Sequence, residues 1–220
     1  MSRVDFGDLR GTEPISRAFG FERGQPIDRY YLEGFLERHA ADVRGHVLEV
    51  GDDGYTRRFG KDRVVHGDIL SLTPDNPDAT IVADLAHAET IPSAAFDCLI
   101  ITQTLQFVYD IRAAVATLHR ILRPGGILLL TVPCVSQVCR YDMDRWGDYW
   151  RFTDAALRRL LIEAFGPAAV AVEAHGNVLA AVGFLHGLAA HEFQAAELDL
   201  QDPDYQVLIT ARAQKHQTDG

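Results

Sequence analysis

The run Ile127–Val132 constrains the fold of this chain more than any other feature of the sequence, because it is almost wholly apolar. A strand has this pattern when both of its faces are buried in a parallel sheet, whereas a strand with one solvent-exposed face alternates apolar and polar residues. A second run of this kind, Phe96–Thr102, lies upstream. Between the two, Ile111, Leu118 and Leu122 belong to a set of apolar residues at helical spacing. The central part of the chain is therefore predicted to be strand, helix, strand.

The same alternation extends to both sides of this central part. Cap residues and turn residues predict helices that start near Asp28, after Asp110 and after Thr153, and a further helix over Val178–Ala190. Alternating strands and helices of this kind predict an α/β fold with a doubly wound, Rossmann-like sheet and right-handed crossovers. If the last two strands pair with each other, one edge of the sheet becomes antiparallel. The further strands are predicted at 46–50, 63–66, 80–83, 170–174 and 206–213.

The length of 220 residues suits one domain, because a chain of this size buries about 70% of its unfolded surface in a single core. We expect a single domain over residues 1–220. Within it, residues 1–40 are expected to form a region with a cap helix. Residues 134–152 are expected to form a loop at the active site.

Charge and cysteine content exclude several classes of function. The formal net charge is −10 and no run of lysine or arginine occurs, so nucleic acid is not expected as a partner. Three cysteines without a CxxC pair suit neither a disulfide framework nor a zinc site, so no metal is predicted and a reducing, cytoplasmic setting is favoured. The longest apolar run, Ile127–Val135, is too short to cross a bilayer, and the start of the sequence has no apolar core of a signal peptide.

The loop after the first predicted strand carries the first candidate site residues. In open α/β sheets, ligands bind at the carboxyl ends of the strands, where the strand order reverses. Here the sequence has Glu49, Gly51, Asp52, Asp53 and Gly54. Two adjacent carboxylates would repel the phosphates of a dinucleotide, but they suit a positively charged ligand such as S-adenosylmethionine. The same glycines also fit an ordinary turn between a strand and a helix.

Two further aspartates follow later strands. Asp68 is expected at the end of the second strand, where a carboxylate can accept hydrogen bonds from both hydroxyls of a ribose. Asp84 is expected at the end of the third strand, where it can bind the exocyclic amine of adenine while the backbone N–H of Leu85 serves a ring nitrogen. Either aspartate alone also fits a helix cap or a solvated turn. Together with the loop after the first strand, the two aspartates give three positions in chain order, each at the carboxyl end of a predicted strand. This arrangement favours a bound nucleoside.

Four segments resemble the class I S-adenosylmethionine-dependent methyltransferases, in particular the type 11 group. They are VLEVG, ADL, FDCLIITQTLQFV and LRPGGILLLTVP, in the order in which the family has them. The segments PIDRYYLEGFL and DRWGDYWRFT more narrowly resemble bacterial methyltransferase domains that occur alone or joined to glycosyltransferases. The resemblance implies a seven-stranded sheet with its last strand inserted antiparallel. It also implies methyl transfer from S-adenosylmethionine, with S-adenosylhomocysteine as product.

The resemblance also implies roles for single residues. Gly51 would face the methionine part of the cofactor, and Thr102 and Gln103 would border the cofactor at the end of the fourth strand. Arg29 and Tyr30 on the cap helix would belong to a lid over the methionine carboxylate. With Asp68 at the ribose and Asp84 and Leu85 at the adenine, these residues make up the expected cofactor site.

Two positions depart from the family's pattern. Asp53 and Tyr55 stand where the first loop of the family usually has glycines, so this loop is expected to take a different path or to be shielded by Tyr55. Gln106 stands where many relatives have a histidine. A general base at that position is therefore absent.

The chemistry of methyl transfer depends mainly on positioning and on exclusion of water, so the protein needs at most a weak base. His175 is one candidate base, but it equally fits a turn histidine beside the next helix. The rings between residues 141 and 152 equally fit a role in pinning the loop to the core. The candidates for the base are Tyr141, Asp144 and His175, and those for contact with the acceptor are Gln106, Asp142, Trp146 and Trp150.

The sequence therefore favours methyl transfer to a small molecule, in particular O-methylation of a saccharide or another hydroxylated metabolite. The alternative is a cofactor-binding module without catalysis that acts through a partner such as a glycosyltransferase. A nicotinamide-dependent oxidoreductase is disfavoured by the carboxylates of Asp52 and Asp53. The sequence carries no signal for an oligomeric state.

Overall fold

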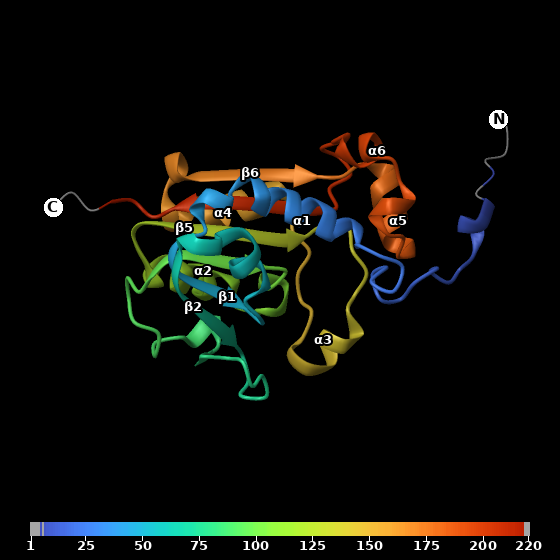
Figure 1. The fold of residues 1–220 in the computed structure, drawn as a ribbon. Coiled ribbons are helices and arrows are strands. Elements are labelled where there is room, and N and C mark those ends of the chain that lie inside the picture. The colour runs from blue at the N-terminus through green and yellow to red at the C-terminus, as the bar shows by residue number, and fades with distance from the viewer. Residues whose placement is uncertain (1–4, 6, 218–220) are drawn as a thin grey trace.

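The computed structural model describes residue 5 and residues 7–217, so residues 1–4, 6 and 218–220 of the expected domain and cap region lie outside it. Seven strands form one sheet in the order β3-β2-β1-β4-β5-β7-β6 (Figure 1). The α/β class and the seven-stranded, doubly wound sheet are confirmed. The strands are β1 (Gly45–Val50), β2 (Val64–Ser71), β3 (Ile81–Val82), β4 (Phe96–Thr102), β5 (Leu122–Pro133), β6 (Val170–His175) and β7 (Leu208–Gln214).

One strand of the sheet runs against the others. β7 is antiparallel to both of its neighbours, β5 and β6, while the remaining pairs are parallel. The last strand is therefore inserted between the fifth and the sixth, as the resemblance implied. The chain first builds β1, β2 and β3 in one direction and then returns to place β4 on the other side of β1. This reversal between β1 and β4 leaves a crevice at the carboxyl ends of these two strands.

Helices cover both faces of the sheet. In Figure 1, α1 lies in front of the sheet, and α2 and α4 lie behind it. The buried side chains form two clusters, one under α1 and α5 and one under α2 and α4. Among the described residues, no helix combines the length and apolarity that crossing a membrane requires. The α-helices of the described chain are α1 (Ile27–Arg38), α2 (Ile111–Ile121), α3 (Arg140–Trp146), α4 (Asp154–Phe165), α5 (Val178–His186) and α6 (Ala195–Asp199).

Local signals place the helix ends. Asp110 begins α2 by accepting a hydrogen bond from the backbone N–H of Ala113 at 3.0 Å, and Thr153 begins α4 in the same way through Ala156 at 3.2 Å. Both side chains satisfy backbone donors that a helix leaves unpaired in its first turn. At its other end, α5 stops at His186 because Gly187 adopts a left-handed conformation with φ of 71°. The predicted helix up to Ala190 was too long for this reason.

The second strand differs from its prediction in a way that matters for the site. The pair Gly67-Asp68 was interpreted as its end, but β2 continues to Ser71. Leu70 is buried and pairs with Val50 of β1, so the apolar residues beyond the glycine extend the strand. Asp68 therefore lies in mid-strand, opposite Leu48.

Candidate functional site

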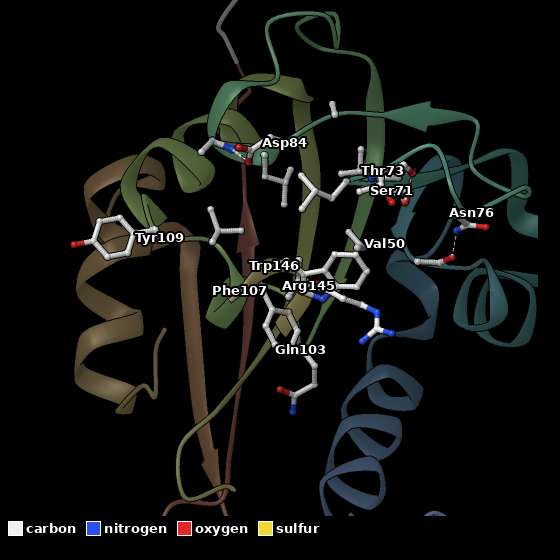
Figure 2. Close-up of a pocket in the computed structure, with 18 of the residues that line it drawn as sticks. Val50, Ser71, Thr73, Asn76, Asp84, Gln103, Phe107, Tyr109, Arg145 and Trp146 are labelled. Atoms are coloured by element: carbon white, nitrogen blue, oxygen red, sulfur yellow. Dashed lines mark hydrogen bonds between the residues drawn. The ribbon is translucent and has the colours of Figure 1, made fainter. Parts of the chain in front are cut away.

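The crevice between β1 and β4 opens into a cavity of about 970 Å³. We call it the strand-end cavity, because the last residues of four neighbouring strands line it. Such a volume lies at the upper end of the range of pockets that hold small molecules and cofactors. Figure 2 shows Asp84 on one side of this cavity and Ser71, Thr73 and Asn76 on another. The strand-end residues are Val50, Gly51, Leu70, Ser71, Ala83, Asp84, Thr102 and Gln103.

Helix α3 and the segment after β4 complete the strand-end cavity. Arg145 and Trp146 of α3 line it, as does Phe107 (Figure 2). The guanidinium carbon of Arg145 lies 3.5 Å from the ring centroid of Tyr141, and Nη1 of Arg145 donates a hydrogen bond to the backbone carbonyl of Tyr141. This stacking holds two large side chains of the expected 134–152 loop at the mouth of the cavity.

A second cavity of about 600 Å³ adjoins the first. We call it the helix-side cavity, because Asp28 and Arg29 at the start of α1 line it together with the loop after β5. Three residues line both cavities: Gln103, Phe107 and Tyr141. Gln103 has a φ of 48°, a left-handed conformation that is strained for a residue with a side chain. The strained residue at the end of β4 thus forms part of the wall between the two cavities.

Polar groups gather around Gln103 at this wall. Its side-chain amide lies 3.5 Å from Oδ2 of Asp28, and its Oε1 accepts a hydrogen bond from Nε2 of Gln106 at 3.2 Å. Within the described chain, Oδ1 of Asp28, Nη1 of Arg29 and Oε1 of Gln106 are buried without a hydrogen-bond partner. Buried polar atoms are nearly always paired, so this set at a cavity wall fits a site that a polar ligand completes.

The carboxyl group of Asp28 is buried at this wall. Its residue is 8% exposed, and burial raises the pKa of the carboxyl above its usual value while the charge of Arg29 opposes that rise. A carboxylate with a raised pKa in a cavity is a common property of groups that accept a proton during catalysis. In the sequence Asp28 marks only the start of a helix, because nothing in the local sequence shows that it packs against Gln103.

The acidic loop after β1 satisfies its own hydrogen bonds. Glu49 accepts from the backbone N–H groups of Tyr55 and Thr56, at 3.2 and 2.7 Å, and burial raises its pKa to about 7. Asp52 accepts from the N–H of Gly54, and Asp53 pairs with a nearby arginine. Glu49 and Asp52, both expected at the cofactor, line neither cavity.

Gly51 is the one member of this loop that lines the strand-end cavity, and its φ is 89°. No atom would meet a side chain added there, so the glycine is needed for its backbone conformation. Asn76 donates to the carbonyl of Gly51 at 2.7 Å and ties the loop after β2 to the loop after β1 (Figure 2). This contact sets the width of the crevice on the β2 side.

Asp68, which was expected at a ribose, lines neither cavity. Its position in mid-strand is the physical reason, since only the last residues of β2 reach the crevice. Its carboxylate is bound by His46 and Thr80 instead. The loop that does reach the cavity contains Asp75, an exposed carboxylate that was not among the predicted site residues. The cluster of proline, aspartate and asparagine around Asp75 is the only signal that could have indicated it.

His175 is also placed differently from its prediction as a base. It ends β6, is 8% exposed and bonds through Nε2 to Oγ1 of Thr210 at 2.9 Å. Its ring stacks on Tyr31 of α1, and burial lowers its pKa to about 4. It lines neither cavity. His175 is therefore a neutral core residue, and the helix after it is capped by Asn177.

The aromatic loop divides into residues at the cavities and residues that hold the loop. Tyr141 lines both cavities, Trp146 lines the strand-end cavity and Asp142 lines the helix-side cavity. Asp144 is exposed and lines neither cavity, so it is not placed to act as a base. Trp150 also lines neither, because it packs on the core and donates to the carbonyl of Val108 at 3.1 Å. The alternative that the rings pin the loop holds for Trp150.

The remaining expected residues fall into two groups. Asp84, Leu85 and Thr102 line the strand-end cavity, and Gln106 lines the helix-side cavity. Tyr30 lies outside both, since its hydroxyl donates to Asp199 at 2.7 Å.

Comparison with known proteins identifies the fold. A family model described as a methyltransferase domain, of type 11, matches residues 53–130. The malonyl-[acyl-carrier protein] O-methyltransferase of Serratia marcescens is 27% identical over 150 residues, which cover 64% of this chain. The match spans 57% of the length of that relative.

Two solved methyltransferase structures have the same fold. A methyltransferase from Archaeoglobus fulgidus superposes with a TM-score of 0.57 at 12% identity, covering 91% of this chain and 100% of that chain. One from Mesorhizobium loti superposes with a TM-score of 0.56 at 18% identity, covering 88% and 99%. Both are named as S-adenosylmethionine-dependent methyltransferases. A methyltransferase-domain model thus matches the central part of the chain, and the sheet with its inserted antiparallel strand has the fold of these S-adenosylmethionine-dependent methyltransferase structures.

Proposed function

We propose that this protein transfers a methyl group to a hydroxyl oxygen of a small molecule, with the cofactor in the strand-end cavity and the acceptor in the helix-side cavity. The observation that carries the proposal is that two cavities meet at Gln103 and Tyr141. A methyltransferase needs two ligands in contact at one point, and this arrangement offers such a point. When bound, S-adenosylmethionine supplies a methyl group activated by the positive charge of its sulfur.

The strand-end cavity fits the nucleoside part of that cofactor. Asp84 offers a carboxylate for the exocyclic amine of adenine, and the backbone N–H of Leu85 offers a donor for a ring nitrogen. Asp75, on the β2 side, offers a carboxylate for the ribose hydroxyls. Leu85 and Trp146 provide apolar surface for the adenine ring. These roles follow from the donor and acceptor groups that face the cavity.

The helix-side cavity fits an acceptor with hydroxyl groups. Gln106, Gln137 and Asp142 present amide and carboxylate groups to it, and Tyr141 presents a ring. Such a mixed lining suits a saccharide or a similar hydroxylated metabolite. The relative from Serratia marcescens is named as an O-methyltransferase, which supports oxygen as the atom that is methylated.

Asp28 is the base in this proposal. Its buried carboxylate lies at the junction, where it can accept the proton of an acceptor hydroxyl as the oxygen is methylated. Gln103 holds this carboxylate in place, and Gln106 holds Gln103. Asp148 is excluded as the base because its side chain, 2% exposed, is paired with Arg151. The three unpaired cysteines are consistent with action in the reducing cytoplasm.

Calorimetric titration with S-adenosylmethionine and with S-adenosylhomocysteine tests the proposal. We expect both to bind at a ratio of one per chain, and we expect methylated product from a panel of hydroxylated acceptors. Binding without a single turnover across the panel would favour the alternative of a cofactor-binding module. Absence of binding of either compound at millimolar concentration would overturn the proposed function.

A variant at the ribose position distinguishes Asp75 from Asp68. Asp75→Ala is expected to weaken S-adenosylhomocysteine binding about three- to tenfold, since one hydrogen bond at an exposed site contributes roughly 0.5–1.5 kcal/mol. Asp68→Asn is expected to leave the dissociation constant unchanged, because Asp68 lies outside the cavity. Titration calorimetry measures both. If Asp68→Asn weakened binding and Asp75→Ala did not, the ribose would lie at Asp68.

A further inference from the structure

The face of the sheet that carries Asp68 also carries two histidines. His46 of β1 pairs directly with His66 of β2 in the parallel register, and Leu48 pairs with Asp68. Since alternate residues of a strand share a face, His66 and Asp68 point to the same side of β2. The two strands lie side by side in Figure 1. The register therefore gathers two imidazoles and one carboxylate at a single place.

The potential ligand atoms of the three side chains lie within 4.8 Å of one another. Nε2 of His46 is 2.6 Å from Oδ2 of Asp68, and Nε2 of His66 is 3.6 Å from Oδ1. In a tetrahedral zinc site with bonds of about 2.0–2.2 Å, ligand atoms are about 3.3–3.5 Å apart. Small rotations of the side chains about their present positions give that spacing.

We propose that His46, His66 and Asp68 bind one Zn²⁺ ion per chain, with a water molecule as the fourth ligand. Imidazole nitrogens with one carboxylate oxygen form a donor set that zinc accepts, whereas Mg²⁺ and Ca²⁺ prefer oxygen ligands alone. His66 has a side chain that is 64% exposed, which gives the ion access from solvent. The side chain of Asp68 is 13% exposed and anchors the site.

Neighbouring groups already orient two of the three ligands. Thr80 donates a hydrogen bond to Oδ1 of Asp68 at 2.6 Å and so fixes the carboxylate. The ring of Phe96 lies 4.6 Å from the ring of His46, between centroids, and limits its rotation. Outer contacts of this kind are usual around metal ligands and raise the affinity of a site.

The ion would link β1 to β2 in the sheet and would not take part in methyl transfer. None of the three ligands lines the strand-end cavity or the helix-side cavity. The proposal is thus independent of the proposed function. The three ligands come together only when β1 and β2 are paired in the folded chain. Zinc therefore binds the folded state alone, and its binding would raise the temperature of unfolding.

Titration of untagged, metal-free protein with Zn²⁺ tests this site, at pH 7.5 and with Mg²⁺ in excess. We expect one ion per chain and a higher melting temperature. His66→Ala is expected to weaken binding about tenfold and to lose the rise in melting temperature, while the fold should be kept because the side chain of His66 is exposed. His191→Ala is the matched control, since His191 is an exposed histidine outside the cluster, and it should bind as the unaltered protein does.

Cobalt gives a second readout, since tetrahedral Co²⁺ absorbs visible light more strongly than Co²⁺ in water. We expect this absorption in the unaltered protein and in His191→Ala, and its loss in both His66→Ala and Asp68→Asn. Absence of stoichiometric zinc binding in the unaltered protein would overturn the proposal. Binding of equal strength in His66→Ala would also overturn it, because the ion would then lie at other residues.

Discussion

Replacing Asp28 by asparagine is expected to lower kcat by about 10²- to 10⁴-fold, the range that a positioned base contributes. Asparagine has nearly the same shape and keeps the contact with Gln103, but it cannot accept a proton. The affinity for S-adenosylhomocysteine is expected to remain unchanged, since Asp28 lines the helix-side cavity and not the strand-end cavity. Steady-state kinetics with a hydroxylated acceptor, together with calorimetry, measures the two quantities.

The pH profile gives an independent measure of the same role. Burial raises the pKa of Asp28, so its carboxyl becomes protonated at a higher pH than an exposed aspartate does. Because the base must be ionised, kcat is expected to fall as the pH decreases through this raised pKa. The acid limb of the profile is expected to vanish in Asp28→Asn.

Glu37→Gln is the matched control for Asp28→Asn, because Glu37 is an exposed carboxylate on the same helix and lines neither cavity. It is expected to keep the activity of the unaltered protein. A different result for Asp28→Asn, with weak cofactor binding and a normal kcat, would assign Asp28 to the ammonium group of the cofactor. Asp28 would then not be the base.

Strands and helix starts could be predicted because their signals are local. The apolar run Phe96–Thr102 became β4 with the expected bounds, and Asp110 and Thr153 cap their helices as their position indicated. The end of β2 could not be predicted in this way. A glycine followed by an aspartate resembles a turn, but pairing with β1 keeps the chain extended up to Ser71. Sheet neighbours thus decided a boundary that the local sequence left ambiguous.

The site residues likewise divide into those that local sequence signals place and those that distant contacts place. Asp84 and Leu85 were predicted from the end of a strand, and Thr102 and Gln103 from the family resemblance, and all four line the strand-end cavity. The position of His175 depends instead on Thr210 and on α1, which lie far away in the sequence.

Contacts of long range also explain the two features that the sequence did not reveal. Asp28 and Gln103 are 75 positions apart, and only the packing of α1 over the end of β4 brings them together. His46 and Asp68 are 22 positions apart, without the spacing of a familiar metal motif, and the register of β1 and β2 joins them.

Removing the carboxylate of Asp84 is expected to weaken cofactor binding by roughly 1–3 kcal/mol, about 5- to 150-fold, because polar groups of a buried ligand then lack a partner. Asp84 lines the strand-end cavity and also accepts from the N–H of Ala86 at 2.9 Å. Alanine at this position therefore removes a helical cap as well as a ligand contact. A loss of affinity could arise from either cause.

Two further variants separate these causes. Asp84→Asn keeps an oxygen for the N–H of Ala86, but it turns a donor toward the adenine amine, so it should preserve the melting temperature and still weaken binding. Asp78→Ala removes an exposed carboxylate from the loop between β2 and β3, outside both cavities, and should change neither quantity. If Asp84→Asn bound S-adenosylhomocysteine as tightly as the unaltered protein, the adenine would lie elsewhere. The strand-end cavity would then hold another part of the cofactor, since Ser71 and Thr73 offer polar groups across the cavity from Asp84 (Figure 2) and Asp75 also lines it.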